Sequence, residues 1–366
     1  MSGPADHLAG VCHAVFCFDV GFSVDLDALA ATLENATRER VVRVRRPSPA
    51  WFEYEPAPVG AHLPGDPIGV GGWETEPGAD VRVYDFGAVA VRYRIPFDAD
   101  AESLVGLGVE LYDHAALLAD AHRHVARLVE TASDAIARAE VSEHVEDYAV
   151  YAVERWEGDP KDAIERSGDA IARLLQAERG PLAPERVKRT LAGAISYAPT
   201  DAALIDWNAA ILFDPEPDDM LTVLVHANIE LMEVRWLDAQ LDDLLDGAHD
   251  LLARVNRARV WPGGAAGAEL RRFAELQADS ALLFEGVNNA IKLIGDQHLA
   301  RVYQVASDAL NLPQWDASVL RKLSVAESIY QKMSDTVSTQ RLEVLEWIII
   351  ILILISIVMP FLGITY

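Results

Sequence analysis

The C-terminal segment of this 366-residue chain, residues 347–366, carries no charged side chain. In a helix, about 20 apolar residues at a rise of 1.5 Å each cover a hydrocarbon core of roughly 30 Å. The sequence therefore predicts one C-terminal membrane-spanning helix that holds a globular body, residues 1–346, at a bilayer by its tail. The expected anchor residues are the apolar Trp347, Ile351 and Ile355, with Ser356 and Pro360 as interruptions of the run.

The body has a strong excess of acidic side chains. Lys and Arg together number 31 and Asp and Glu 57, which gives a formal net charge of −26 at pH 7. A surface of this sign repels phosphate backbones, and this argues against direct nucleic-acid binding. Two origins of the acidity stay open: a high-salt cytoplasm, or a genome whose codons favour Ala, Arg and Asp.

The N-terminus and the cysteines indicate where the body resides. Residues 1–10 lack the basic and apolar regions of a signal peptide, so we expect the bulk of the chain to be cytoplasmic. Cys12 and Cys17 lie five residues apart and would point to opposite faces of a strand, which excludes a disulfide between them. A single-pass membrane protein with its body in a reducing compartment fits these features.

Hydrophobic periodicity predicts an α+β fold. A strand-rich N-terminal α/β unit precedes long antiparallel C-terminal helices, and a stalk helix runs from these into the anchor. We expect four segments along the chain: the strand-rich unit at 1–100, mixed helix and short strands at 101–215, long helices and stalk at 216–346, and the anchor at 347–366.

Individual elements of the first two thirds follow from alternation, capping and turn residues. We expect strands at Val11–Asp19 and Tyr148–Trp156, short strands within Gly193–Phe213 and a helix at Asp25–Ala36. The segment Val81–Phe97 is expected to be either a hairpin or a bulged strand, with its bend at Gly87. Residues 47–80, rich in Pro and Gly, are expected to be mostly loop, and a long helical segment should cover residues 101–139.

A faint internal repeat links two of these segments. Phe18-Asp19-Val20-Gly21 and Tyr84-Asp85-Phe86-Gly87 share an aromatic-Asp-apolar-Gly pattern after an apolar run. The Asp can cap a turn and the Gly permits a positive φ. Either duplicated halves or chance similarity would account for the four positions.

Three long helices are expected after residue 215, at about Asp218–Arg257, about Ala266–Leu310 and from near Asp316 onward. Apolar residues recur in the last of these at alternating steps of three and four, as in a coiled coil. This seam packs either against the preceding helix of the same chain or against other copies. Its central positions are Leu323, Tyr330, Met333, Val337 and Val344, with Gln340 as the polar break.

The motifs of common catalytic and nucleotide-binding sites do not occur, so we expect a protein without enzymatic activity and without a cofactor. His226, Glu230 and Glu233 lie at i, i+4 and i+7 of the expected helix and are weak candidates for a metal site. Asp296 and His298 on the next helix could add ligands, although two residues apart they do not share a face. The alternative is a solvated or ion-paired helix face.

The segment Arg38–Arg46 is the one basic concentration, with Trp51 and Tyr54 nearby. It could contact phosphate, either an RNA backbone or lipid headgroups. The alternative is the wet face of an edge strand, whose cations prevent edge-to-edge aggregation.

The C-terminal third resembles the required-for-meiotic-nuclear-division protein 1 family. The resemblance rests on Asn289–Asp296, Ala300–Tyr303, Leu320–Leu323 and a Leu345-Glu346-Trp347 junction before an Ile-rich run, and it extends over residues 195–358. It implies a membrane-anchored protein without enzymatic activity, since mitochondrial members support translation of membrane proteins. The positions that carry it are Asn228, Glu233, Arg235, Asp296, Arg301, Lys322 and Glu346.

These observations predict a membrane-anchored scaffold or tether that presents a cytoplasmic domain. Its expected partners are the lipid bilayer and either further copies of the chain or another membrane or ribosome-associated protein. The alternative function is an oligomeric ion channel or transporter with the head, stalk and span of the CorA type. A metal-dependent enzyme at His226, Glu230 and Glu233 is a third hypothesis.

Overall fold

The computed structural model describes residues 7–33, 37–38, 56–257, 271, 274–275, 278 and 297–358. The chain divides into two compact units. The first, here called the head unit, comprises Met1–Arg235 and Gly286–Trp315, and the second, the helical unit, comprises Trp236–Glu285 and Asp316–Tyr366. The helices α7 (Asp218–Arg257) and α10 (Leu312–Val358) each contribute residues to both units.

An eight-stranded sheet forms the centre of the head unit, in the order β11-β12-β10-β1-β8-β7-β4-β3. Neighbouring strands are antiparallel except β10 and β12, which are parallel. The strands are β1 (His7–Asp19), β3 (Thr37–Arg38), β4 (Val59–Leu63), β7 (Ala79–Val83), β8 (Ala88–Asp100), β10 (Val145–Arg155), β11 (Ala202–Ile205) and β12 (Ala209–Phe213). Two small ribbons pair β2 (Ser23–Val24) with β9 (Ile136–Ala137), and β5 (Gly69–Val70) with β6 (Trp73–Glu74).

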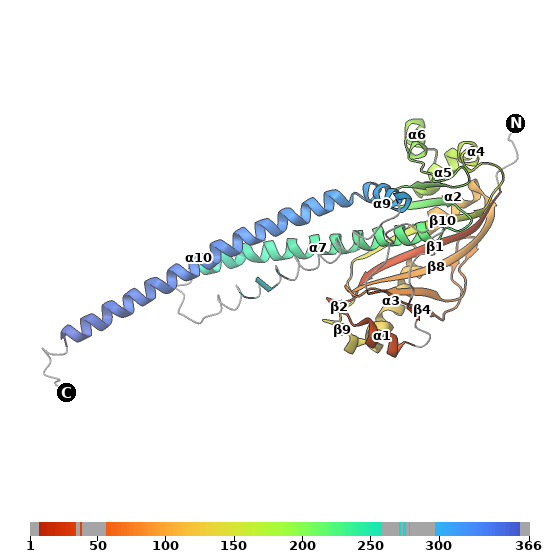
Figure 1. Ribbon diagram of the computed structural model, residues 1–366. Coiled ribbons are helices and arrows are strands. Elements are labelled where there is room, and N and C mark those ends of the chain that lie inside the picture. Colours follow the sequence, from red (N-terminus) through yellow and green to blue (C-terminus); the bar gives the residue numbers. More distant parts are fainter. Residues whose placement is uncertain are drawn as a thin grey trace. The chain divides into compact units, whose positions relative to one another are not determined.

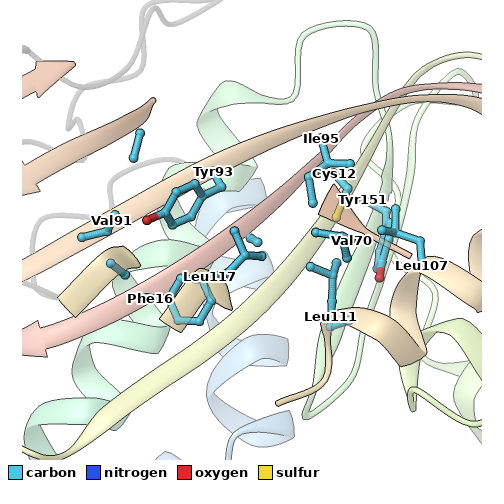
Figure 2. Packing of buried hydrophobic residues seen from close by; sticks show 14 of the residues in the cluster. Cys12, Phe16, Val70, Val91, Tyr93, Ile95, Leu107, Leu111, Leu117 and Tyr151 are labelled. Atoms are coloured by element: carbon cyan, nitrogen blue, oxygen red, sulfur yellow. The ribbon is translucent and has the colours of Figure 1, made fainter. Parts of the chain in front are cut away.

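One face of the sheet packs against helices that follow β8 and β10 in the chain. These are α2 (Ala101–Leu111), α3 (Ala115–Thr131), α4 (Pro160–Arg166) and α5 (Gly168–Leu175). Cys12 and Phe16 of β1, Tyr93 and Ile95 of β8 and Tyr151 of β10 meet Leu107, Leu111 and Leu117 of the helices (Figure 2). Strand residues two apart share a face, so this core uses every second residue of three long neighbouring strands.

The opposite face is covered by α7 and by α9 (Gln297–Ala309) (Figure 1). Val15 and Cys17 of β1 lie on this side, together with Val223, Ile229 and other residues from the first half of α7. The sheet is therefore buried on both faces. Cys12 and Cys17 lie in the cores on opposite faces, as their spacing predicts, and both are free thiols.

The expected hairpin and the first helix are confirmed. Strands β7 and β8 pair directly, and Gly87 takes a φ of 99° in the turn between them. Asp25 caps α1 (Leu26–Thr32) by accepting hydrogen bonds from the backbone N–H groups of Asp27 and Ala28. The strands β4, β5 and β6 lie inside the segment 47–80 that was expected to be loop, because short strands between Gly and Pro residues leave no clear alternation.

The two copies of the aromatic-Asp-apolar-Gly pattern lie side by side in the structure. The N–H of Val20 donates to the carbonyl of Gly87 at 3.0 Å, and that of Val24 donates to the carbonyl of Asp85 at 2.7 Å. A Cβ at Gly87 would lie 1.9 Å from the carbonyl oxygen of Gly21. The glycines thus let the end of β1 and the β7–β8 turn approach at backbone distance.

The two long helices of the helical unit, α7 and α10, run parallel to each other. Leu237 and Leu241 of α7 pack with Val319 of α10, and farther along both helices Leu244 packs with Ala326. Because the residue numbers of the contacting positions increase together along α7 and α10, the two helices run in the same direction. The expected antiparallel partner at about Ala266–Leu310 falls largely outside the described residues, and its described end is α9 in the head unit.

The predicted C-terminal membrane span is wrong. In the ranges that the structure describes, no helix combines the length and the apolar composition that a bilayer crossing requires. The apolar part of α10 begins after Glu346 and is described to Val358. Pro360 and the rest of 359–366 lie outside the described residues. The tail-anchored, single-pass arrangement and the membrane localisation are therefore not supported.

Candidate functional site

His226, Glu230 and Glu233 all lie on α7, and their burial contradicts the alternative of a solvated face. Their side chains are 1%, 1% and 3% exposed. The hydroxyl of Tyr303 on α9 donates to Oε2 of Glu230 at 2.6 Å, and its ring lies 6.3 Å from that of His226. Among the described residues, no group of three or more His, Cys, Asp or Glu side chains is arranged to hold a metal ion. Asp296 lies outside those residues, and His298 faces the ring of Tyr197 at 5.2 Å.

A buried polar layer joins α7 to the sheet. The amide of Asn228 donates to Sγ of Cys17 at 3.3 Å, and Arg235 forms an ion pair of 2.5 Å with Glu146 of β10. Burial raises the pKa of Glu146 to about 7 despite this arginine. Burial also holds the pKa of Glu233 well above its usual range, and the nearby carboxyl of Asp19 adds to that shift.

These groups orient α7 on the sheet, and burial favours the protonated form of their carboxyls. Asp19 belongs to the same layer, and burial raises its pKa to about 7. Oε1 of Glu233 and Oδ1 of Asn228 have no hydrogen-bond partner within the described part of the chain. Such buried polar atoms cost stability, which is consistent with a layer that specifies how the helix docks.

The remaining positions of the C-terminal resemblance have local structural roles. Arg301 donates to the side chain of Gln304 at 3.0 Å, and Lys322 pairs with Asp238 at 2.8 Å inside the helical unit. Glu346 is exposed on α10.

The heptad seam of α10 packs within the chain over its first half. Val319, Ala326 and Met333 are buried, and Leu323 and Tyr330 are half-buried beside α7. Val337 and Val344 also lie on α10, but their side chains are outside the described part. The first half of the seam thus packs within the chain, with α7 as its partner in place of the expected helix at about Ala266–Leu310, most of which lies outside the described residues.

Farther along α10 the apolar side chains are exposed. Trp347 is 65% exposed, and the eight following residues are each between 45% and 59% exposed. Leu342 and Leu345 extend this surface toward the seam, at 62% and 54%. The residues that we call the apolar run are Trp347, Ile348, Ile349, Ile350, Ile351, Leu352, Ile353, Leu354 and Ile355. A helix that is apolar on all sides is normally buried, so this run indicates an interaction surface.

A second feature, which sequence reasoning missed, is a shallow notch on the head unit. It lies where the end of α2 meets β1, β10 and the turn between β11 and β12. Tyr112 and Asn208 line it, and Asp147 contributes a carboxylate. Trp207 stands beside it, with its ring 6.5 Å from that of Tyr112. The notch draws on three distant segments of the sequence, so no local pattern marks it.

The basic segment Arg38–Arg46, with Trp51 and Tyr54, lies outside the described residues except for Arg38 at the end of β3. Within the described chain, the apolar run and the notch are the two features that a packed core does not explain.

Comparison with known proteins identifies the family of the head unit. The chain belongs to the family described as uncharacterized protein MJ0711, N-terminal domain, which matches residues 9–220. It is 24% identical over 217 residues to uncharacterized protein MJ0711 of Methanocaldococcus jannaschii. The match spans 59% of this chain and 66% of that protein. No solved structure matches the chain.

This assignment overturns the resemblance to the required-for-meiotic-nuclear-division protein 1 family. The family match begins in β1 and ends at the start of α7, whereas that resemblance rested on short motifs after residue 195 and on an Ile-rich end. Apolar C-terminal helices are common and carry little family information. The expectation of a role in translation at a membrane has no remaining support.

Proposed function

We propose that this member of the MJ0711 N-terminal-domain family is a non-catalytic scaffold that assembles with copies of itself through the apolar run of α10. The observation that carries the proposal is the exposure of nine consecutive large apolar residues, Trp347–Ile355, on one helix. Assembly through this run would place several head units in one particle.

The size of the surface favours a stable contact. Side chains of this size that are about half exposed present together on the order of 1,000 Å² of apolar area. A standard protein interface buries roughly 800 Å² on each partner. Exposed apolar patches of this size are typical of protein interaction sites.

Two features favour a second copy of α10 as the occupant. The apolar run belongs to α10, and earlier turns of α10 pack against α7 through Val319 and Ala326. Packing against another helix is therefore already how α10 buries its apolar side chains. The run also carries no charge, so identical segments can meet without repulsion. The charge of the rest of the chain, in contrast, disfavours association elsewhere on the surface.

Sedimentation velocity of the full-length chain tests the proposal. We expect wild type to sediment as a particle of two or more chains, and the double variant Ile351→Glu/Ile355→Glu to sediment as a monomer. The matched control Leu320→Glu/Val325→Glu adds the same charge at two exposed positions of α10 outside the run and should remain assembled. A wild-type chain that sediments as a monomer would overturn the proposal, and so would a monomer that binds lipid vesicles in a flotation assay. An equal effect of the two double variants on the sedimentation coefficient would also overturn it.

A further inference from the structure

The notch on the head unit is a shallow, half-open hollow with a volume of about 10 Å³, which is room for one water molecule. Its floor comes from adjacent strands, β1 and β10, and its rim from Leu111 and Tyr112 at the end of α2 and from Asn208 at the β11–β12 turn. Every one of these residues belongs to the head unit. A hollow of this size encloses no cofactor, so a ligand group would lie across its rim, against the side chains that border it.

Two exposed aromatic rings border this hollow. Tyr112 is 49% and Trp207 46% exposed, and their rings meet edge to face with an interplanar angle of 82°. Exposed tryptophan and tyrosine side chains are the residue types most enriched among the energetic centres of protein interfaces. Elsewhere in the described head unit, Tyr197 is the other large apolar side chain that is mostly exposed.

The turn that carries Trp207 is fixed in place by its neighbour Asp206. The carbonyl of Asp206 accepts a hydrogen bond from the hydroxyl of Tyr148 at 2.8 Å, and one carboxylate oxygen accepts one from Gln176 at 3.2 Å. The other carboxylate oxygen accepts the N–H of Trp207 itself at 2.8 Å. Because the turn is held from both sides, the indole is presented at little entropic cost.

The charge at the notch is negative and uncompensated. Partial burial and the nearby Asp113 both raise the pKa of Asp147. Among the described residues no Lys or Arg forms an ion pair with Asp147 or Asp113. A cation that entered the notch would relieve this unfavourable pair of carboxylates.

From this geometry we infer that the notch binds an arginine side chain of a partner protein. A guanidinium group can donate two parallel hydrogen bonds to the carboxylate of Asp147 while its plane packs on one of the two nearly perpendicular rings. A lysine ammonium offers no planar face and is more strongly hydrated, so it fits this combination less well. A basic partner also complements the net charge of −26.

Titration of the full-length chain with a tetra-arginine peptide, followed by calorimetry at low salt, tests the inference. We expect Trp207→Ala and Asp147→Asn each to weaken binding about tenfold, and a tetra-lysine peptide to bind at least several-fold more weakly than tetra-arginine. The control variant Tyr197→Ala removes an exposed aromatic side chain of the same unit away from the notch and should bind as wild type.

Three results would overturn the inference. They are the absence of tetra-arginine binding, equal affinity for the two peptides, or equal binding by Trp207→Ala, Asp147→Asn and wild type. Equal binding by those variants would mean that the peptide associates with the acidic surface in general. Trp207 and Asp147 are exposed, so their substitution should leave the fold intact. Circular dichroism of each variant checks that weaker binding is not caused by unfolding.

Discussion

The ammonium of Lys322 lies 2.8 Å from Oδ1 of Asp238 and joins α10 to α7 inside the helical unit. Lys322 also contacts Asp242 at 2.6 Å and donates to the backbone carbonyl of Asp238 at 3.1 Å. These carboxylates raise the pKa of Lys322. One cation thus bridges two successive turns of the facing helix, and this fixes the parallel register of the pair.

Replacement of Lys322 by methionine should destabilise the helical unit by about 1–2 kcal/mol, because it leaves the largely buried carboxylate of Asp238 without its cation. Urea unfolding followed by circular dichroism measures the loss. Arg321→Met removes a neighbouring exposed cation and is the matched control, with an expected change within about 0.5 kcal/mol. Equal losses in the two variants would show that the Lys322 bridge contributes nothing specific.

Glu233→Gln should stabilise the head unit by about 1 kcal/mol or more at pH 8, because glutamine cannot ionise, whereas folding at this pH must either protonate the Glu233 carboxyl or bury its charge. The pKa of Glu233 is raised in the folded state, so the native protein holds a proton that the unfolded chain loses above its ordinary pKa of 4.5. The contribution of Glu233 to the stability of the wild-type protein is therefore fully present below about pH 4.5, and it decreases as the pH rises.

Thermal unfolding of wild type and Glu233→Gln between pH 4.5 and 8 measures this dependence. The gain in melting temperature should grow with pH. Tyr303→Phe, which deprives the buried Glu230 of a donor at 2.6 Å, should in contrast lose about 1–3 kcal/mol. A gain from Glu233→Gln that is largest at low pH would contradict the account.

Gly87→Ala should destabilise the head unit by several kcal/mol. The residue has a φ of 99°, and a Cβ would lie 1.9 Å from the carbonyl oxygen of Gly21, so the backbone itself would have to move. Gly69→Ala is the control, because a Cβ there meets nothing within 4 Å. Soluble yield and melting temperature report the difference. Similar values for the two variants would show that the turn can relax without cost.

Much of the head unit could be predicted from local sequence, because its elements carry local signals. The β7–β8 hairpin follows from alternation on both sides of Gly87, and the start of α1 follows from the capping side chain of Asp25. The opposite placement of Cys12 and Cys17 follows from the two-residue period of β1 alone.

Other parts depend on contacts that no local pattern encodes. The polar positions 226, 230 and 233 of α7 were expected to be solvated or metal-bound, yet tertiary packing buries them against the sheet and α9. The parallel direction of α7 and α10 depends on the route of the chain between them. The notch joins Tyr112, Asp147 and Trp207, which only the order of the strands brings together.

Assembly through the apolar run should respond to salt. The net charge of −26 makes copies repel one another at low ionic strength, and salt screens this repulsion while it leaves apolar contacts intact. Light scattering at 0.05 M and 0.5 M sodium chloride should show more association at the higher concentration. Dissociation on addition of salt would indicate ion pairs instead of apolar contact.

The most direct test of the central claim is a cysteine scan of the apolar run. Cys12 and Cys17 are fully buried, and burial raises their pKa values, so only an introduced thiol should react. Single cysteines at positions 351–355 are compared, under mild oxidation, with the exposed control Leu320→Cys. The account predicts disulfide-linked dimers within the run at helical spacing and none at position 320. Dimers absent from the run, or equally abundant at position 320, would contradict it.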